Sequence, residues 1–292
     1  MTPRQQLKAL AQARRGVIVP GAFNALSARV IADQGFEAIY VTGAGVTNMA
    51  FGLPDQGFMG LPDIAEHTAR IRDAVELPLI VDADTGFGNA LNVVHAVRTL
   101  ERAGADCIQL EDQVAPKRCG HFAGKDVIGL DEAVSKIKAA VDTRRDPDLL
   151  VMARTDAAAT QGFEAAVERA QRFAEAGADI LFVEAVTSAA EVRALPQRLA
   201  TPQLLNMVIG GRTPIVGADE LKQLGYGFVL YANAALQAAV AGMQRVLHTL
   251  QAQGRVDEDP ALVASFGERQ RLVGKPHWDA LERRYAVPPQ AD

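Results

Sequence analysis

A short pattern recurs along the chain and constrains its fold more than any other feature. The segments "LERAGADCIQLED" (100–112) and "FAEAGADILFVEA" (173–185) each contain a helix end, a glycine, Ala-Asp, an apolar run and an acidic residue. Looser copies occur at 31–43 and 221–232. Each copy predicts a helix that is closed by a left-handed glycine and leads directly into a buried strand. The chain is therefore expected to repeat a strand–helix unit.

Other apolar runs complete the expected set of strands. They lie at 16–23, 77–86, 149–157 and 203–208, and helical patterns such as 89–104 and 162–177 follow most strands. Strands that are apolar throughout indicate a parallel sheet covered by helices. About eight such units predict an α/β protein, a closed (β/α)8 TIM barrel. The alternative, an open doubly wound sheet, is disfavoured because no GxGxxG motif follows the first strand.

The 292-residue chain is longer than a minimal barrel requires. Residues 1–250 are predicted to form the barrel and residues 251–292 a C-terminal helical extension. The extension contains one or two amphipathic patterns, divided near 274–276. Such an appendage is expected to pack on the barrel or on a neighbouring subunit of a homo-oligomer.

Composition disfavours several classes of partner. The net charge of −5, without a long basic run, argues against nucleic acid. No apolar stretch approaches the roughly 20 residues of a membrane span, and the N-terminus lacks an apolar signal core. Two cysteines without metal-ligand spacing predict a cytoplasmic protein and argue against a structural zinc site.

Polar residues gather where the expected strands end. In a barrel of this kind, chemistry takes place at the carboxyl ends of the strands. The residues expected there are Tyr40, Thr42, Gly43, Asp82, Asp84, Glu111, Asp112, Arg154, Asp156, Glu184 and Asn206. The sequence therefore predicts a polar site at this end of the barrel.

The acidic residues among them predict a metal site. Residues two apart on a strand share a face, so Asp82 and Asp84 are expected to point to one place. Two close carboxylates repel each other unless a proton or a cation lies between them. With Glu111 from the next strand, the ligands are all oxygen atoms, as Mg²⁺ prefers, and Asp55 is a candidate outer ligand through water. The alternative is that Asp55 and two other acids, Asp112 and Asp156, cap helices.

Arg154 ends an apolar strand, where a guanidinium is costly without an anionic partner. One interpretation is a two-pronged contact with a substrate carboxylate. The alternative is a salt bridge to Glu184 or Asp156. Spacing alone does not distinguish the two.

A basic segment, "PKRCGHFAGK" (116–125), contains the second notable group, Cys119. Its cationic neighbours are Lys117, Arg118, His121 and Lys125. Positive neighbours lower the pKa of a thiol, and the long loop 113–129 is of a kind that often forms a lid. The alternative is a small residue in a basic turn. Cys107, within an apolar run, is predicted to be a buried hydrophobic residue.

Several motifs in this order resemble the isocitrate lyase/phosphoenolpyruvate mutase superfamily. They include "DADTGFG" (82–88), "EDQ" (111–113), "KRCGH" (117–121) and "GGRTP" (210–214). The resemblance covers nearly the whole chain. It is strongest to the small bacterial branch that contains 2-methylisocitrate lyase, 2,3-dimethylmalate lyase and the plant petal death protein.

The resemblance implies a Mg²⁺-dependent barrel, with Mn²⁺ as a possible substitute. It further implies that the eighth helix is swapped between subunits, with dimers paired into a homotetramer. Asp84 would be the nearest metal ligand, and Asp82, Asp55 and Glu111 would hold metal-bound waters. The implied substrate-binding residues are Thr42, Gly43, Ala44, Lys117, Gly120, Arg154, Glu184 and Asn206.

The implied reaction is the cleavage of a carbon–carbon bond in a 2-hydroxy dicarboxylate resembling 2-methylisocitrate or an alkylmalate. The products are an α-keto acid such as pyruvate and a second carboxylate. Cys119, on a gating loop with His121, would protonate the carbanion, and Tyr40 is a candidate base. The alternatives are an oxaloacetate decarboxylase and a carboxyphosphonoenolpyruvate-type phosphonomutase. A non-catalytic binding protein is disfavoured, since all expected positions are filled.

The sequence departs from the pattern of the methylisocitrate lyases in the segment after Asn206 and in the segment after the eighth expected strand. Where methylisocitrate lyases carry polar and cationic residues, this chain has Val208, Ile209 and Gln237. A buried, unpaired carboxylate is costly, so a tricarboxylate is expected to bind poorly. The prediction is a substrate with a smaller or more apolar substituent.

Overall fold

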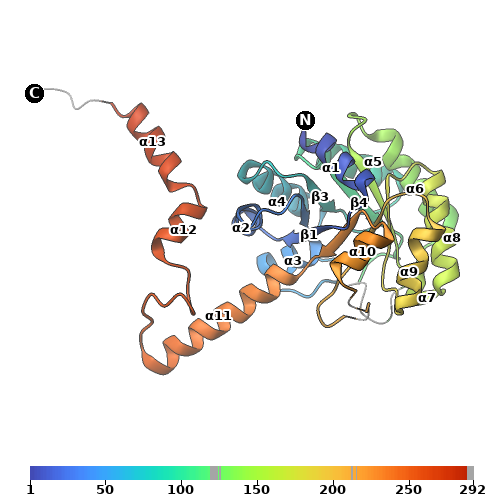
Figure 1. The fold of residues 1–292 in the computed structure, drawn as a ribbon. Helices are drawn as coiled ribbons and strands as arrows, with labels where there is room; N and C mark the ends of the chain where they lie inside the picture. The colour runs from blue at the N-terminus through green and yellow to red at the C-terminus, as the bar shows by residue number, and fades with distance from the viewer. Residues whose placement is uncertain (119–123, 125, 212, 215, 288–292) are drawn as a thin grey trace, which may run out of the picture. The chain divides into compact units, whose positions relative to one another are not determined.

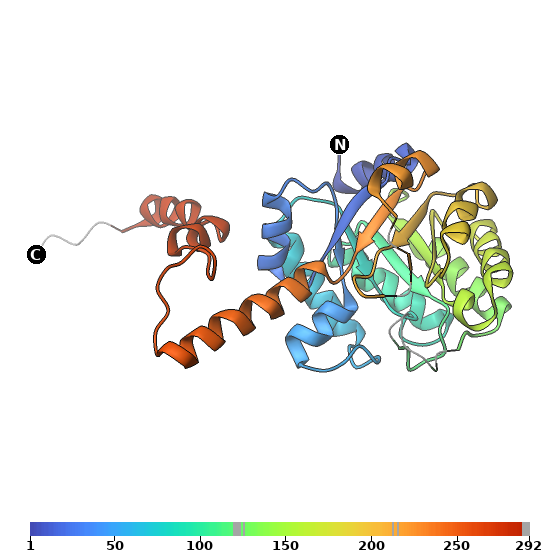
Figure 2. The same cartoon turned by 60° about the horizontal axis from the view of Figure 1, so that its bottom comes forward.

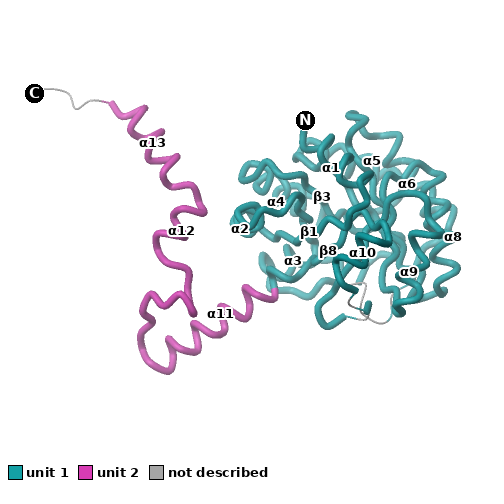
Figure 3. The backbone as a smooth tube through the Cα atoms, viewed as in Figure 1, with its two compact units in different colours: residues 1–236 teal, residues 237–292 magenta. Residues whose placement is uncertain are grey.

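The computed structural model describes residues 1–118, 124, 126–211, 213–214 and 216–287. The chain consists of two compact units, with the boundary between residues 236 and 237 (Figure 3). Unit 1, residues 1–236, contains a closed barrel whose neighbouring strands are parallel and follow chain order (Figure 1). The prediction of a (β/α)8 TIM barrel is confirmed.

The barrel strands of the described residues are all where the apolar runs predicted them. Their bounds are β1 Val17–Ala22, β2 Ile39–Val41, β3 Leu79–Asp82, β4 Cys107–Glu111, β5 Leu150–Thr155, β6 Ile180–Val183, β7 Gln203–Asn206 and β8 Phe228–Tyr231. The first and last strands pair with each other, with Val17 beside Phe228. The open-sheet alternative is therefore wrong.

Helices follow the strands and surround the barrel (Figures 1 and 2). In unit 1 they are α1 Pro3–Ala13, α2 Ala25–Asp33, α3 Gly43–Val46, the π-helix η1 Thr47–Phe51, α4 Leu61–Ala74, α5 Ala90–Arg102, α6 Leu130–Thr143, α7 Ala157–Thr160, α8 Phe163–Glu175, α9 Ala189–Arg198 and α10 Ala218–Leu224. Helix α11, Ala234–Gln253, begins at the end of unit 1 and continues into unit 2.

The recurring Gly-Ala-Asp pattern has a physical explanation in the barrel. Gly104 and Gly177 follow α5 and α8 with φ of +98° each, a conformation that favours glycine. The aspartate that comes two residues later binds the start of a neighbouring strand. Asp106 accepts a hydrogen bond of 2.8 Å from the Leu79 amide, and Asp179 accepts one of 2.9 Å from the Val151 amide. The pattern thus ends a helix and fixes the next strand against its neighbour.

Two apolar layers lie on the two sides of the strands. The outer layer packs the barrel against its helices, and the inner layer fills the barrel. Cys107 belongs to the inner layer and is fully buried, as predicted. Helix α1 adds Leu7 and Leu10 to this layer, and its Arg4 donates to the Ala105 carbonyl before β4. The inner core therefore fills the amino end of the barrel, while its carboxyl end carries the polar residues.

Unit 2, residues 237–292, contains the rest of α11 together with α12, Phe266–Leu272, and α13, Lys275–Tyr285. The amphipathic segment predicted to divide near 274–276 consists of these last two helices, and Gly274 between them has a φ of +72°. None of the helices in the described part of the chain combines the length and the apolar character needed to cross a bilayer.

Candidate active site

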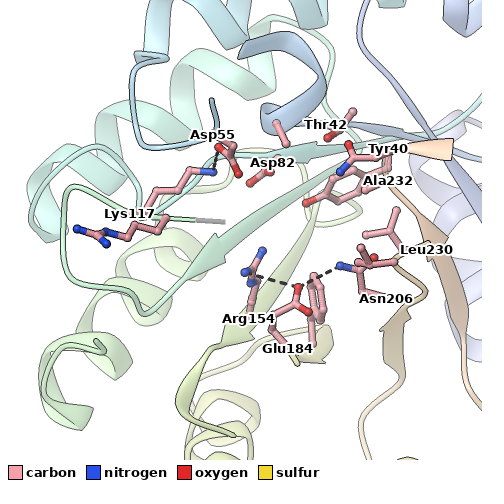
Figure 4. Close-up of a pocket in the computed structure, with 15 residues that line it drawn as sticks. Tyr40, Thr42, Asp55, Asp82, Lys117, Arg154, Glu184, Asn206, Leu230 and Ala232 are labelled. Carbon is pink, nitrogen blue, oxygen red and sulfur yellow. Dashed lines mark hydrogen bonds and ion pairs between the residues drawn. The ribbon is translucent and has the colours of Figure 1, made fainter. Parts of the chain in front are cut away.

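A cavity opens at the carboxyl ends of the strands (Figure 4). Its lining is mostly polar and includes several apolar side chains. The lining residues are Tyr40, Thr42, Ala44, Asp55, Asp82, Lys117, Arg118, Arg154, Phe182, Glu184, Asn206, Val208, Leu230, Ala232 and Asn233. Most of the polar residues predicted from the strand ends thus meet at one place.

Arg154, from β5, is nearly buried and surrounded by carboxylates. Asp156 binds it at two points, with Nε–Oδ2 and Nη2–Oδ1 distances of 2.9 and 3.1 Å. Glu111 Oε2 lies 3.2 Å from Nη1, and Glu184 Oε2 lies 3.5 Å from Nη2. Burial opposes its charge, but these carboxylates raise the pKa of Arg154 well above its ordinary value. The predicted salt bridges therefore exist, and the guanidinium still faces the cavity as a permanent cation.

The acids on the other side of the cavity surround Lys117. Its Nζ lies 2.9 Å from Asp84 Oδ1 and 2.5 Å from Asp55 Oδ1, and the contact with Asp55 is drawn in Figure 4. Burial opposes the charge of Lys117, but Asp84, then Glu111, raises its pKa well above the ordinary value. Lys117 therefore balances part of the negative charge at this position.

Asp82 and Asp84 come together as predicted, but for a different reason. Asp82 is the last residue of β3, whereas Asp84 lies beyond the strand with a φ of +46°. A left-handed turn, and not strand alternation, brings Asp84 to the rim. The Asp84 amide donates to Asp82 Oδ1 at 3.2 Å, which fixes the turn to the carboxylate before it.

Negative charge exceeds positive charge around this cavity. The carboxylates that line or border it are Asp55, Asp82, Asp84, Glu111, Asp156 and Glu184, and the cations are Lys117, Arg118 and Arg154. Burial raises the pKa of Asp84 to about 7, against the opposing effect of Lys117. Burial likewise raises the pKa of Glu111 well above its ordinary value. Bound positive charge would relieve this imbalance.

The donor set fits a hard divalent cation. Glu111 Oε1 is buried without a hydrogen-bond partner among the described residues. Among the residues that the structure describes, no three acidic, histidine or cysteine residues lie close enough together to chelate an ion by themselves. Mg²⁺ usually keeps several waters and takes only one or two carboxylates directly. The described carboxylates therefore suit a partly hydrated ion better than an all-protein cage.

Tyr40 points into the cavity from β2, and its hydroxyl donates to Gln109 Oε1. Gln109 is fully buried, and its Nε2 has no partner among the described residues. Sequence reasoning missed this glutamine. The available signal was a single amide in the otherwise apolar strand "CIQL". Burial, followed by the charge of Asp82, raises the pKa of Tyr40 well above its ordinary value, which favours a hydrogen-bond donor over a base.

The segment that follows β2 forms the first turn of α3. Thr42 and Ala44 line the cavity, and Thr42 Oγ1 accepts a hydrogen bond of 3.2 Å from the Gly45 amide. The Gly43 amide donates to Asp82 Oδ2 at 3.3 Å. A Cβ at Gly43 would lie only 3.1 Å from that same oxygen. A side chain at this position would therefore press on the Asp82 carboxylate.

Glu184 and Asn206 lie beside each other across from Tyr40 (Figure 4). Asn206 Nδ2 donates to Glu184 Oε2 at 3.1 Å, and Glu184 Oε1 accepts from the Ala185 amide at 2.8 Å. Asn206 Oδ1 is buried without a partner among the described residues. This amide oxygen is therefore available to a donor group of a ligand.

The alternative interpretation of three aspartates as helix caps is not supported by their contacts. Asp156 precedes α7, but its side chain makes no cap hydrogen bond and instead binds Arg154. Asp112 accepts from the Thr155 hydroxyl at 2.7 Å and from the Asp156 amide at 2.9 Å. Asp55 binds Lys117. All three acids belong to the network around the cavity.

The loop 113–129 is closed at its base by backbone pairing. The Val114 amide donates to the Asp126 carbonyl, and the Ile128 amide to the Asp112 carbonyl, each at 2.9 Å. Lys117 and Arg118, in the first half of the loop, line the cavity. The predicted residues Cys119, Gly120 and His121, together with Lys125, lie outside the described residues.

The segment at residues 7–251 matches the family model described as phosphoenolpyruvate phosphomutase. The chain belongs to this family. The superfamily predicted from the motifs is thereby confirmed.

Named relatives are lyases. The chain is 40% identical over 287 residues to 2,3-dimethylmalate lyase of Eubacterium barkeri, which covers 98% of this chain and 99% of that enzyme. It is 45% identical over 252 residues to 2-methylisocitrate lyase of Aeropyrum pernix, which covers 86% and 81% of the two chains.

Solved structures of the superfamily have the same fold. A crystal structure of 2,3-dimethylmalate lyase matches with a TM-score of 0.92 at 35% identity, over 100% of this chain and 99% of that one. Phosphonopyruvate hydrolase in complex with oxalate and Mg²⁺ matches with a TM-score of 0.87 at 32% identity, over 98% and 99% of the two chains. These enzymes share the barrel but differ in the reactions that their names describe.

The family's barrel has an apolar wall in this chain. Val208, Leu230 and Ala232 line the cavity, with the amide of Asn233 beside them. Ile209 is 51% exposed, and Gln237 is exposed in unit 2. Of the departures noted in the sequence, Val208 lines the cavity in the described structure.

Proposed function

We propose that this protein is a Mg²⁺-dependent carbon–carbon lyase. Its substrate is a 2-hydroxy dicarboxylate, which it splits into an α-keto acid such as pyruvate and a second carboxylate. The observation that carries the proposal is the cavity at the strand ends, where the buried guanidinium of Arg154 faces a surplus of carboxylates. A cation for the substrate and acids for a metal are thus within one site.

Asp84 is the proposed nearest ligand of Mg²⁺, with Asp82, Asp55 and Glu111 holding its waters. When bound, the ion draws electron density from the oxygens of the substrate and so favours loss of the hydroxyl proton. Mn²⁺, a similar hard ion, is expected to substitute. In the described structure Lys117 pairs with two of these carboxylates, Asp55 and Asp84. We therefore infer that Lys117 leaves these carboxylates and binds the substrate when the ion is present.

Arg154 and Asn206 are proposed to hold the oxyacid end of the substrate. The guanidinium suits a carboxylate, while Glu184 fixes the Asn206 amide through its 3.1 Å contact. Thr42, Gly43 and Ala44 are proposed to bind the other carboxylate. These contacts orient the bond that breaks between the two ends.

Cleavage begins when the substrate hydroxyl gives its proton to a base of the site, for which the carboxylates that border the cavity are the candidates. The hydroxyl oxygen becomes the keto oxygen, the bond between the carbinol carbon and its neighbour breaks, and the electron pair passes to the neighbouring carbon. Cys119 is proposed to donate its proton to that carbon, with Gly120 and His121 on the same loop closing over the site. Lys117 and Arg118, which come immediately before Cys119 in the sequence, favour the thiolate that remains.

The apolar wall favours a particular substituent on the substrate. Val208, Leu230 and Ala232 offer no charged partner for a third carboxylate. Leaving a carboxylate buried and unpaired is costly. We therefore propose that an alkylmalate-like substrate is cleaved in preference to a tricarboxylate such as 2-methylisocitrate.

Substitution of Cys119 by Ser tests the proposed proton donor. A serine hydroxyl is a much weaker acid, so turnover of the true substrate should fall by about 10²–10⁴-fold. Isothermal titration should show that Mg²⁺ and oxalate, a mimic of the enolate product, still bind. Full turnover by Cys119→Ser would contradict the role of the thiol.

The same assays separate the alternative reactions. An oxaloacetate decarboxylase needs Arg154 and the metal but has less need of Cys119, because solvent can protonate pyruvate enolate. Mg²⁺-dependent CO₂ release from oxaloacetate, without cleavage of any alkylmalate, would favour it. Phosphorus NMR would detect a phosphonomutase.

We further propose that the protein acts in the cytoplasm as a homo-oligomer, with dimers paired into a tetramer and the eighth helix swapped between subunits. Small carboxylates are its proposed ligands, rather than nucleic acid or membranes. The proposal includes the packing of residues 251–292 on the barrel or on a partner subunit. Its support is the family to which the chain belongs.

A further inference from the structure

A series of side-chain contacts, which extends to residues outside the cavity, fixes the position of Arg154. The first member is Asp156, whose carboxylate is fully buried and grips the guanidinium at two points, 2.9 and 3.1 Å. The ring of Phe182 lies against the guanidinium, with its centroid 5.2 Å from Arg154 Cζ. Because Glu111 and Glu184 also attract this cation, the two-pronged contact with Asp156 selects one orientation among several.

Asp112, directly after β4, fixes the position of Asp156. Its Oδ1 accepts the Asp156 amide at 2.9 Å, and its Oδ2 accepts the Thr155 hydroxyl at 2.7 Å. These two bonds tie the end of β5 to the neighbouring strand, directly after Arg154. Movement of Asp112 would therefore move the residue that orients the guanidinium.

Arg169, from α8, is a buried cation that contacts Asp112 directly. Its Nη1 lies 3.2 Å from Asp112 Oδ2, and both residues are almost fully buried. Arg169 Nε also donates to Gln161 Oε1 at 3.3 Å. Removing one partner of a buried pair leaves the other charge uncompensated, so the carboxylate of Asp112 depends on Arg169.

We propose that Arg169, acting through Asp112 and Asp156, is a positioning residue for Arg154. It sets the affinity of the site for the oxyacid end of the substrate without touching the substrate. This inference rests on the proposed function, because it assumes that Arg154 binds a carboxylate.

The test compares two arginines of the same helix. Arg169→Gln removes the buried contact, whereas Arg172→Gln removes an exposed arginine that pairs with Glu175 at 3.1 Å. Oxalate binding in the presence of Mg²⁺ is measured by isothermal titration, together with KM, kcat and thermal unfolding. Arg169→Gln should weaken oxalate binding and raise KM about tenfold or more with a smaller change in kcat, and Arg172→Gln should change neither.

Arg169→Lys and Thr155→Val complete the design. Lysine keeps the charge and should restore oxalate affinity to within about threefold of the wild type. Thr155→Val removes one hydrogen bond to Asp112 while conserving shape, so it should weaken oxalate binding by about two- to tenfold. It provides the decisive comparison if Arg169→Gln does not fold.

Two outcomes separate this inference from the proposed function. If the wild type binds oxalate but Arg169→Gln or Thr155→Val lowers only the unfolding temperature, the positioning role is overturned. If the wild type does not bind oxalate with Mg²⁺ at all, the proposed function itself is overturned.

Discussion

Tyr40 is the residue at which the structure most changes the expected chemistry. It was predicted as a candidate base, yet burial, followed by the charge of Asp82, raises its pKa well above the ordinary value. A phenol with a raised pKa stays protonated as the pH rises through neutrality. Its hydroxyl therefore acts as a neutral donor, fixed by Gln109.

Substitution of Tyr40 by Phe should lower turnover by roughly two- to tenfold, the effect of one lost hydrogen bond. The shape of the pH–rate profile should be unchanged, because the hydroxyl does not titrate in the working range. Tyr226→Phe is the matched control, since Tyr226 donates to the Val192 carbonyl outside the cavity and should leave the kinetics unchanged. Loss of a limb of the profile in Tyr40→Phe would show that Tyr40 is a base after all.

Sequence reasoning identified the charged groups and offered the pairing of Arg154 with Glu184 or Asp156, but it did not predict the pairing of Lys117 with Asp55 and Asp84. Arg154 and Glu184 are predictable because charged residues at the end of an apolar strand are unusual. Gln109 was missed, since a neutral amide within a strand carries no comparable signal. The left-handed turn at Asp84 was also missed, because a positive φ at an aspartate depends on tertiary contacts.

At the scale of elements, α6 supports the turn that presents Asp84. Lys136 of α6 is 7% exposed, and its Nζ donates to the Thr85 carbonyl at 3.1 Å. Thr85 directly follows Asp84. A buried lysine from a surrounding helix thus holds the backbone of the proposed metal-binding turn.

Lys136→Met should weaken Mg²⁺ binding by roughly two- to tenfold, the effect of one lost hydrogen bond, because the turn carrying Asp84 loses its support. Lys138→Met is the matched control on the same helix, as Lys138 pairs with nearby Asp142 on the exposed surface. Isothermal titration with Mg²⁺ alone gives the comparison. Equal Mg²⁺ affinity in the two variants would argue against this role of α6.

The strands and the long helices were predictable, and the short helices were not. All the strands and helices such as α5 and α8 follow from apolar periodicity and from the glycine that ends each helix. Helix α3 has only four residues, and its start depends on the Thr42 hydroxyl meeting the Gly45 amide. Such a helix is too short to form by propensity alone, so its position comes from the folded barrel.

At the scale of the whole molecule, barrel closure follows from repetition rather than from any single segment. The pairing of β1 with β8 joins residues more than 200 positions apart, Val17 and Phe228. No local pattern reports such a contact, and the prediction depended on counting units. The division of the chain at residues 236 and 237 follows from contacts that the sequence alone does not reveal.

Helix α11 carries an apolar stripe at helical spacing, with Val240, Met243, Leu247 and Leu250 each at least 40% exposed in the single chain. A homo-oligomer is expected to cover this stripe. The double variant Met243→Glu with Leu247→Glu should therefore dissociate the oligomer in sedimentation velocity. Leu91→Glu, at a position 78% exposed in unit 1, is the control and should leave the oligomer intact.

An unchanged oligomer in the double variant would contradict the assignment of the stripe to a subunit contact. A monomeric wild-type protein would contradict the proposed assembly itself.

The most direct measurement is a coupled assay for release of an α-keto acid across a panel of alkylmalates, 2-methylisocitrate and oxaloacetate, with Mg²⁺ and with chelator. The account predicts Mg²⁺-dependent pyruvate or related keto acid from an alkylmalate, and slower cleavage of the tricarboxylate. If none of the hydroxy dicarboxylates released a keto acid, or if the chelator did not affect the release, this result would contradict it.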